Sequence, residues 1–348
     1  MTPATRAPQE RARGLLLDEP HFEAHRSLGH HPERPERLVA ARAAASRTGF
    51  AWSRVVPTVP TFDVLERTHS EEHVARLEAW RGRQGHLDAD TFVAPGSVAA
   101  AHLAAGGCIA MVDALFEGPE DFGLALVRPP GHHATRSKAM GFCLLNNAAI
   151  AANRARERGA GRVAIVDWDV HHGNGTQEIF WDDPSVLYLS LHQAPLFPGT
   201  GRVDEVGGPH AEGTTVNVPL EAGSDDGVYR LAFERLVLPV LEAFAPEFLI
   251  VSAGFDASYR DPLAQMAVTP DGFGWLARAL DGIHTNAGSC ATMYVLEGGY
   301  DLVGLEDSLL ASLHGARGAE FAAAAPSDPG LMIGAAAQRL RSHWSCVR

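Results

Sequence analysis

The 348-residue sequence predicts an α/β protein in which a mostly parallel sheet is covered by helices on both faces. Two observations support this fold class. Short apolar runs alternate along the chain with longer, alanine-rich stretches of helical periodicity, and glycine or proline residues bound most of the apolar runs. Hydrophobic residues make up 46% and charged residues 20% of the chain, which is the ordinary composition of a protein that buries a large core.

Seven apolar runs are short enough and bounded closely enough to be strands. They are GLLLD (14–18), FGLALV (122–127), RVAIVDWDV (162–170), VLYLSLH (186–192), TTVNVPL (214–220), EFLIVSAGF (247–255) and TMYVLEGG (292–299). The helices are predicted at 35–48, 97–117, 146–158, 225–244, 271–287 and 301–315. Within the fourth helix, apolar residues recur at helical spacing from Val228 to Leu241.

One domain is expected at residues 14–348, preceded by a disordered polar leader at residues 1–13. The leader carries arginines and no apolar segment, and the rest of the chain contains no internal repeat and no linker that would divide it. No apolar run is expected to reach the roughly 18 residues of a membrane span.

The charge and the cysteines narrow the functional class. The formal net charge of −13 leaves no basic surface for a phosphate backbone, so nucleic-acid binding is not expected. The four cysteines are far apart and form no CxxC pair, which is typical of a reducing compartment, and we expect a cytoplasmic protein; they are Cys108, Cys143, Cys290 and Cys346.

Polar motifs follow the carboxyl ends of four predicted strands. They are RPPGHH after 127, DWDVHHGN at 167–174, GFDA after 253 and EGGYD after 296. Since ligands of open parallel sheets bind at this edge, the four motifs are expected to form one site.

Asp169, His171 and Asp256 form a predicted metal site. Asp169 and His171 are two residues apart at the end of a predicted strand, where alternation points both side chains to the same side, and Asp256 ends another strand. Two carboxylates and one imidazole suit a zinc ion, tolerate iron(II), and leave a coordination position open for water and substrate. Each residue alone would more often cap a helix or face solvent, so the prediction depends on the set.

His132, His133 and Tyr300 add the groups that amide hydrolysis needs. Pro129, Pro130 and Gly131 suit a rigid loop that presents both imidazoles, and Asp167 lies where it can orient one of them. A histidine can move the proton between water and the leaving amine, and the Tyr300 hydroxyl can donate to the developing oxyanion.

Six motifs together resemble the histone deacetylase family, in family order and within a match that runs from Gly29 to Leu313. They are RPPGHHA (128–134), GFCLLNN (141–147), DWDVHHGNGTQ (167–177), SAGFDA (252–257), DPL (261–263) and LEGGYD (296–301). The chain most resembles the class II enzymes and their bacterial relatives, the histone-deacetylase-like amidohydrolases. The resemblance implies the three-layer αβα arginase/deacetylase fold, with a central, mostly parallel eight-stranded sheet.

The resemblance also implies a role for each residue of the site. Asp169, His171 and Asp256 would be the zinc ligands, and His132 and His133 the tandem proton-transfer pair. Tyr300 would be the transition-state tyrosine, Asp167 the partner of His132, and Asn174 the class II residue beside His133. A narrow acyl-lysine channel is implied at Gly141, Phe142, Phe197, Leu263 and Gly299, although both phenylalanines would otherwise be interpreted as core. A structural potassium ion is implied at the side chains of Asp167 and Ser190 and the carbonyls of Asp167, Asp169, His171 and Leu191.

Three other functions remain alternatives. An acetylpolyamine amidohydrolase would use the same zinc site, but the longer dimerising insertion of those enzymes has no counterpart between Gly85 and Gly96. An arginase-like enzyme would need ligands for two manganese ions, and the motifs supply ligands for one. A non-catalytic acyl-lysine binding protein would not need Tyr300 and a full ligand set. The expected substrate is an acylated lysine or a small acylated amine; the acyl group and a homo-oligomeric state stay open.

Overall fold

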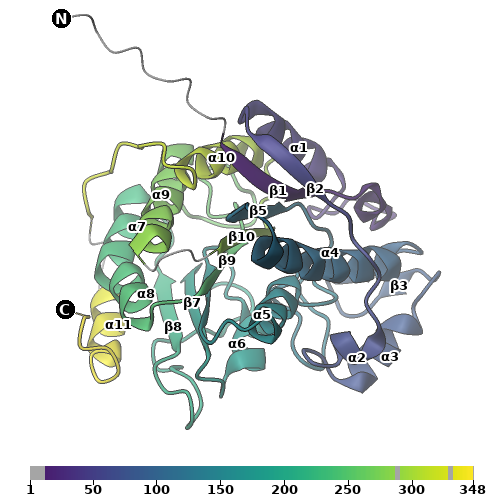
Figure 1. Ribbon diagram of the computed structural model, residues 1–348, viewed down its shortest axis with the longest axis horizontal. Helices are drawn as coiled ribbons and strands as arrows, with labels where there is room; N and C mark the ends of the chain where they lie inside the picture. The colour runs from purple at the N-terminus through teal and green to yellow at the C-terminus, as the bar shows by residue number, and fades with distance from the viewer. Residues whose placement is uncertain (1–11, 287–290, 328–331, 348) are drawn as a thin grey trace, which may run out of the picture.

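The computed structural model describes residues 12–286, 291–327 and 332–347, so most of the expected leader and Cys290 lie outside the described residues. A parallel sheet crosses the molecule, and helices cover both of its faces (Figure 1). Its eight strands run in the order β2-β1-β5-β10-β9-β6-β7-β8, and every pair of neighbours in this sheet is parallel. The predicted three-layer α/β fold with an eight-stranded sheet is confirmed.

Seven of the eight strands overlap the predicted ones. The strands are β1 (Arg13–Leu17), β2 (Ala51–Val55), β5 (Phe122–Ala125), β6 (Val163–Asp167), β7 (Val186–Gln193), β8 (Thr215–Leu220), β9 (Phe248–Ala253) and β10 (Ala291–Leu296). The sequence analysis missed β2, an edge strand that pairs with β1 alone and is largely exposed, so it lacks the apolar run of a central strand. A separate antiparallel pair consists of β3 (Gly85–His86) and β4 (Phe92–Val93).

Five of the predicted helices correspond to single α-helices. These are α1 (Glu36–Arg47), α4 (Ser97–Glu117), α5 (Asn147–Glu157), α9 (Pro270–Asn286) and α10 (Leu302–Gly315). The sixth is interrupted: α7 (Asp226–Ala232) and α8 (Leu238–Phe244) flank the π-helical segment η2 (Phe233–Val237). Pro239 lacks the N–H that regular α-helical bonding would require there.

Five short helical elements were not predicted from the sequence. They are η1 (Pro20–Ala24), α2 (Phe62–Leu65), α3 (Glu71–Glu78), α6 (Asn174–Phe180) and α11 (Met332–Leu340). Each has nine residues or fewer, which is too short for helical periodicity to stand out in the sequence.

Helix α4 corrects one expectation. It is long and apolar enough, by length and composition alone, to cross a membrane, with a mean hydropathy of 1.7 over its most apolar window. The expectation that no run reaches this length was therefore wrong. In the fold, 67% of that window is buried, and α4 packs against α5, β1 and β5 as the core helix of a soluble protein does.

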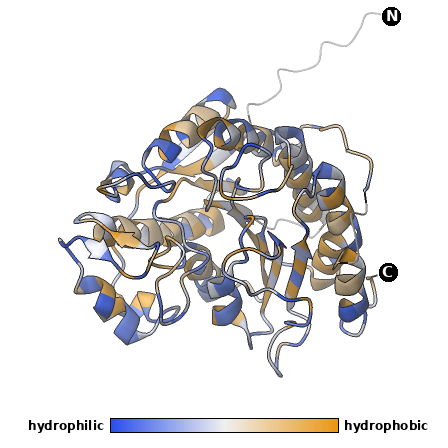
Figure 2. Cartoon of the chain, turned by 180° about the vertical axis from the view of Figure 1, so that it is seen from behind, coloured by the Kyte–Doolittle hydropathy of each residue, from blue (hydrophilic) through white to orange (hydrophobic). Residues whose placement is uncertain are grey.

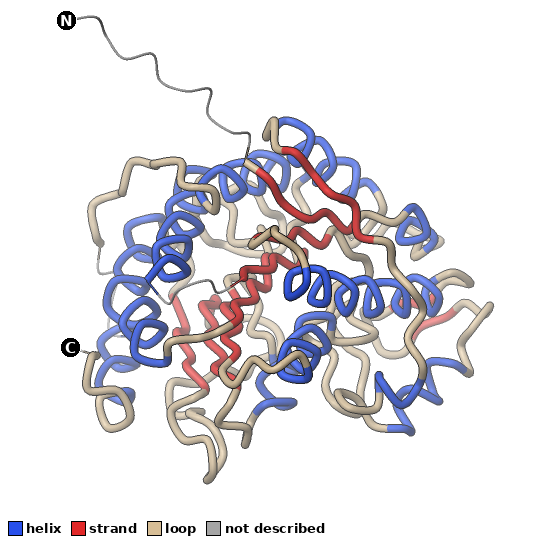
Figure 3. The backbone as a smooth tube through the Cα atoms, viewed as in Figure 1, coloured by secondary structure: helices blue, strands red, loops and turns tan. Residues whose placement is uncertain are grey.

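The strand order explains where the site forms. Strands β10, β9 and β6 are neighbours in the middle of the sheet, where the strands run side by side in Figure 3. Seen from behind, hydrophilic residues predominate in the outer loops and helix turns, and hydrophobic ones in the interior strands (Figure 2). The polar residues that follow β6, β9 and β10 therefore meet at one edge of an otherwise apolar core.

Candidate active site and metal centre

Asp169, His171 and Asp256 come together at the carboxyl edge of the sheet, although in loops rather than on strands. Strand β6 ends at Asp167, so the strand alternation expected for Asp169 and His171 does not apply, and β9 ends at Ala253, before Asp256. In these loops, carboxylate oxygens accept the backbone N–H groups that a neighbouring strand would otherwise bind. Asp169 Oδ1 accepts the His171 N–H (2.9 Å), and Asp256 Oδ1 accepts the Val170 N–H (2.9 Å).

The three side chains, which we call the carboxylate cluster, face one another at ligand distance. Their nearest donor atoms all lie within 4.8 Å, and His171 Nδ1 is 3.2 Å from Asp169 Oδ1 and 3.1 Å from Asp256 Oδ2. A Cβ added to Gly298 would clash with both carboxylates, whereas its N–H donates to Asp169 Oδ2 (2.7 Å). Gly298 therefore makes room for the cluster.

The carboxylate cluster fits a divalent metal ion. Both carboxylates are fully buried, and burial, together with the charge of Asp169, raises the pKa of Asp256. Two adjacent buried carboxylates carry more negative charge than one imidazole can balance. A bound dication would neutralise the remaining negative charge. Among the described residues these three form the one group with metal-binding geometry, and their oxygen and nitrogen donors suit zinc or iron(II).

His132 and His133 are buried beside the cluster with different partners. Their rings lie 4.0 Å apart, His132 Nδ1 is 3.0 Å from Asp167 Oδ2, and His133 Nδ1 is 2.8 Å from Asn174 Oδ1. Burial lowers the pKa of His132, but Asp167 and Asp169 outweigh it and raise that pKa well above 6.5. Burial, with the charge of His132, lowers the pKa of His133 well below 6.5. The pair thus contains one charged and one neutral imidazole.

Tyr300 is buried and contacts Arg37, Phe142 and Asp261. Its ring is 5.0 Å from the Arg37 guanidinium and 5.9 Å from the Phe142 ring, and its backbone N–H donates to Asp261 Oδ2 (2.6 Å). Burial, together with the charge of Asp256, raises the pKa of Tyr300 well above 10. The phenol therefore stays protonated and able to donate.

The residues expected to line the channel differ in their exposure and in what they contact. Phe197 is 40% exposed, not core, and its ring packs edge-on at 5.0 Å from the His133 ring. A Cβ on Gly141 would lie 2.5 Å from His133 Cδ2 and 2.9 Å from Phe197 Cε1, so only glycine fits between them. Phe142 follows with a left-handed φ of 68° and is partly buried.

Leu263 and Gly299 complete the expected channel set. Leu263 is partly buried and its N–H donates to Asp261 Oδ1 (3.0 Å). Gly299 is buried, and a Cβ there would face Phe255 and Leu305 in the core rather than the aromatic rings of the channel.

The side chains expected at the potassium site are neighbours across two strands. Asp167 on β6 and Ser190 on β7 are register partners, and both are fully buried. Asp167 Oδ2 accepts from Tyr188 OH (3.0 Å), and Ser190 Oγ is 2.9 Å from His192 Nδ1. Leu191 follows Ser190 on the same strand.

Two buried carboxyl groups of the site were missed as functional residues. Glu297 Oε2 accepts the N–H groups of Gly131 (2.7 Å) and His132 (3.2 Å) and so fixes the histidine loop. Burial raises the pKa of Glu297 to about 7, and burial together with Asp256 raises the pKa of Asp261 to about 7. Glu297 directly follows an apolar strand in the LEGGYD motif, and Asp261 is the first residue of the DPL motif. Their positions within these motifs were the sequence signal that could have identified them.

A second buried polar group, which we call the arginine cluster, consists of Glu33, Arg37 and Arg128. Arg128 binds Glu33 Oε2 (2.6 Å), and Arg37 binds Glu33 Oε1 (3.2 Å) and the Gly299 carbonyl (2.6 Å). Burial would raise the pKa of Glu33, but Arg128 and His25 lower it well below 4.5. The arginine cluster thus holds the backbone just before Tyr300 through hydrogen bonds of buried guanidinium groups.

This geometry defines a class: a hydrolase of α/β architecture with a candidate metal site, a histidine pair and a tyrosine hydroxyl. The sequence profile described as "Histone deacetylase domain" matches residues 31–316. The chain is 45% identical over 289 residues to "Histone deacetylase 15" of Arabidopsis thaliana, covering 81% of this chain and 52% of that protein. It is 40% identical over 273 residues to the "Histone deacetylase-like amidohydrolase" of Pseudomonas aeruginosa, covering 77% of this chain and 71% of the relative.

A solved structure agrees with the sequence comparisons. The crystal structure of the HDA15 HD domain superposes with a TM-score of 0.90 at 38% identity and covers 97% of this chain and 98% of that one. The chain belongs to the histone deacetylase family, a family of deacetylases and amidohydrolases. It spans about half the length of the Arabidopsis relative.

Proposed function

We propose that the chain is a zinc-dependent deacylase that hydrolyses the amide bond of N6-acetyl-lysine. The observation that carries the proposal is the convergence of the carboxylate cluster, the paired imidazoles of His132 and His133 and the buried Tyr300. Asp169, His171 and Asp256 would hold the zinc ion. When bound there, zinc would supply a Lewis acid that lowers the pKa of water and polarises the acyl carbonyl.

His133 acts as the general base and then as the general acid. Its Nδ1–H donates to Asn174 Oδ1, which leaves the lone pair of Nε2 free to take a proton from the attacking water. The water oxygen bonds to the acyl carbon, the C–N bond breaks, and Nε2 returns the proton to the leaving amine. The products are a free amine and a carboxylate.

His132 and Tyr300 stabilise the negative charge that develops in this step. Asp167 keeps His132 protonated, so a fixed positive charge lies beside the reacting groups. The Tyr300 hydroxyl donates to the oxygen of the acyl carbonyl, and its ring is held by Arg37 and Phe142.

An acetylpolyamine amidohydrolase is the second candidate function. The observation that favours it is 40% identity over 312 residues with a human protein named as a polyamine deacetylase, covering 85% of this chain and 45% of that protein. The matches to histone deacetylases and the missing insertion between Gly85 and Gly96 favour lysine. The same proposal includes a structural potassium ion at Asp167 and Ser190 and a cytoplasmic location.

Turnover of a fluorogenic acetyl-lysine peptide tests the proposal. Exhaustive chelation should abolish activity, and added zinc or iron(II) should restore it. Tyr300→Phe should lower kcat about 10²- to 10³-fold while KM changes little, because the hydroxyl acts mainly in the transition state. Activity that survives chelation would remove the metal from the mechanism, and binding of the peptide without turnover would favour the non-catalytic binding protein.

A further inference from the structure

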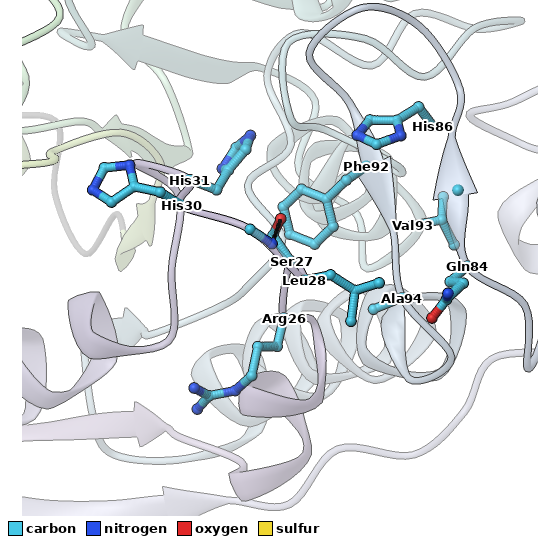
Figure 4. Close-up of a pocket in the computed structure, with 12 residues that line it drawn as sticks. Arg26, Ser27, Leu28, His30, His31, Gln84, His86, Phe92, Val93 and Ala94 are labelled. Atoms are coloured by element: carbon cyan, nitrogen blue, oxygen red, sulfur yellow. Dashed lines mark hydrogen bonds between the residues drawn. The ribbon is translucent and has the colours of Figure 1, made fainter.

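Two cavities lie near the two aromatic residues expected in the channel: His31, which packs against Phe142, lines one, and Phe197 lines the other. The cavity on the Phe142 side, of about 450 Å³, lies between the loop that carries His30 and His31 and strands β3 and β4 (Figure 4). His31 divides it from the channel, because its ring packs edge-on against both Phe92 (4.8 Å) and Phe142 (4.7 Å). Its lining includes the guanidinium group of Arg26 and the imidazoles of His30, His31 and His86 among apolar groups.

The cavity on the Phe197 side, which we call the apolar pocket, is larger. Its volume is about 640 Å³, and apolar side chains form most of its lining, including Pro195, Leu196, Val203 and Pro219. The charged residues of the lining, Arg202 and Asp204, bind each other (2.9 and 2.6 Å), so the pocket carries no net charge. The volume and the lining of this pocket are typical of pockets that bind an apolar group of a ligand.

Phe197 belongs to both the apolar pocket and the catalytic site. Its ring packs against the catalytic-site residues His133 (5.0 Å) and His171 (6.4 Å), and the same residue lines the pocket. It is also 40% exposed. A ligand that enters the site past Phe197 therefore has the apolar pocket beside its outer part.

We propose that the apolar pocket binds an apolar side chain next to the acylated lysine, so that the enzyme prefers acylated segments that carry such a neighbour. The inference rests on the proposed deacylase function. An extended peptide advances about 3.3–3.6 Å per residue, so a side chain one or two positions from the acyl-lysine reaches over Phe197.

A polyamine does not satisfy this pocket. Its ammonium groups would need free carboxylates, and the Asp204 carboxylate of the lining is paired with Arg202. Its short, charged chain would also leave the apolar lining in contact with water. Burial of a leucine side chain removes that contact, which is the physical basis of the expected preference.

A peptide panel tests the inference on the wild-type enzyme. Acetyl-lysine peptides carry leucine or serine one or two positions to either side, and acetyl-lysine amide and N-acetylspermidine serve as substrates without a neighbour. We expect kcat/KM about 5- to 20-fold higher for leucine than for serine at one of these positions.

Variants locate the preference in the pocket. Val203→Asp places a charge in the lining and should reduce the leucine preference to about twofold, while the rate with acetyl-lysine amide stays unchanged. Val59→Asp changes an exposed valine (58% exposed) outside the lining and should leave the preference intact. Val203→Ala should reduce the preference less and guards against misfolding of the aspartate variant.

Three outcomes would overturn the inference. Equal kcat/KM for leucine and serine peptides would overturn it while the deacylase function stands. A leucine preference that survives Val203→Asp in a folded protein would place the side chain elsewhere. Hydrolysis of acetylspermidine alone, or of no substrate, would overturn the lysine deacylase proposal and this inference with it.

Discussion

The carboxylate cluster and the arginine cluster are both buried at the same edge of the sheet, yet their charges are balanced in opposite ways. The arginine cluster finds its partners within the chain, since the two guanidinium groups donate to Glu33 and to backbone carbonyls, and Arg128 and His25 lower the pKa of Glu33. The carboxylate cluster does not, since burial and mutual repulsion raise the pKa of Asp256. The difference indicates that the arginine cluster stabilises the fold and that the carboxylate cluster binds a cation.

The largest expected effect comes from Asp256→Asn, which removes one metal ligand and one buried charge. Activity should fall about 10³-fold or more, because the metal supplies several kcal/mol of transition-state stabilisation. The melting temperature of chelated protein should not fall, because Asn keeps the acceptor for the Val170 N–H and repulsion with Asp169 is relieved. Scanning calorimetry with and without zinc checks this.

Zinc provides the internal control for that experiment. It should stabilise the wild type by about 4 kcal/mol at a thousandfold excess over Kd, and the variant far less. A chelated variant markedly less stable than chelated wild type would show that the carboxylate cluster is balanced without a cation.

Glu33→Gln, unlike Asp256→Asn, should destabilise the protein. It leaves Arg128 and Arg37 buried with uncompensated charge, so we expect the free energy of unfolding to fall by about 3–5 kcal/mol. Glu306→Gln is the matched control, because it breaks an exposed pair with Arg47 and should cost less than about 1 kcal/mol. Denaturant unfolding measures both, and equal losses would contradict the structural role of the arginine cluster.

Motifs revealed the carboxylate cluster but not the arginine cluster, for a physical reason. Asp169, His171 and Asp256 follow apolar strands, so their burial at one edge follows from the fold class. Glu33 stands in HHPERPERL, a charged segment that looks exposed, and its partner Arg128 is 95 residues away. Sequence spacing does not show which charges of such a segment are buried.

The same limit explains the other differences between sequence and structure. Seven strands were predicted because central strands are continuous apolar runs, whereas the edge strand β2 is not. Phe197 looks like a core residue by type, and only the arrangement of its loop beside His133 leaves it 40% exposed. Hydrophobicity predicts what is buried in layers, but not which aromatic residue borders a site.

A pH titration of stability tests a third buried group, Glu297, whose backbone carbonyl accepts from Arg37 and whose carboxyl group binds the histidine loop. Burial raises its pKa to about 7, so between about pH 4.5 and 7 the unfolded chain loses this proton while the folded protein keeps it. The stability of chelated wild type should therefore fall as pH rises through this window, by up to about 3 kcal/mol from this group. Glu297→Gln should remove that part of the slope, as denaturant unfolding at several pH values would show. An unchanged slope would contradict the assignment.

The smallest expected effect concerns the two histidines. Like the two clusters, they are buried side by side but differ in the charge of their partners. His132 faces the Asp167 carboxylate and His133 faces the Asn174 amide, at 3.0 and 2.8 Å. Asn174→Asp would give His133 the partner that His132 has, and the added carboxylate should raise the pKa of His133. Since the base must be deprotonated, the acid limb of the kcat/KM profile should move about one pH unit upward. A limb that stays in place would mean that the proton is taken by a group other than His133.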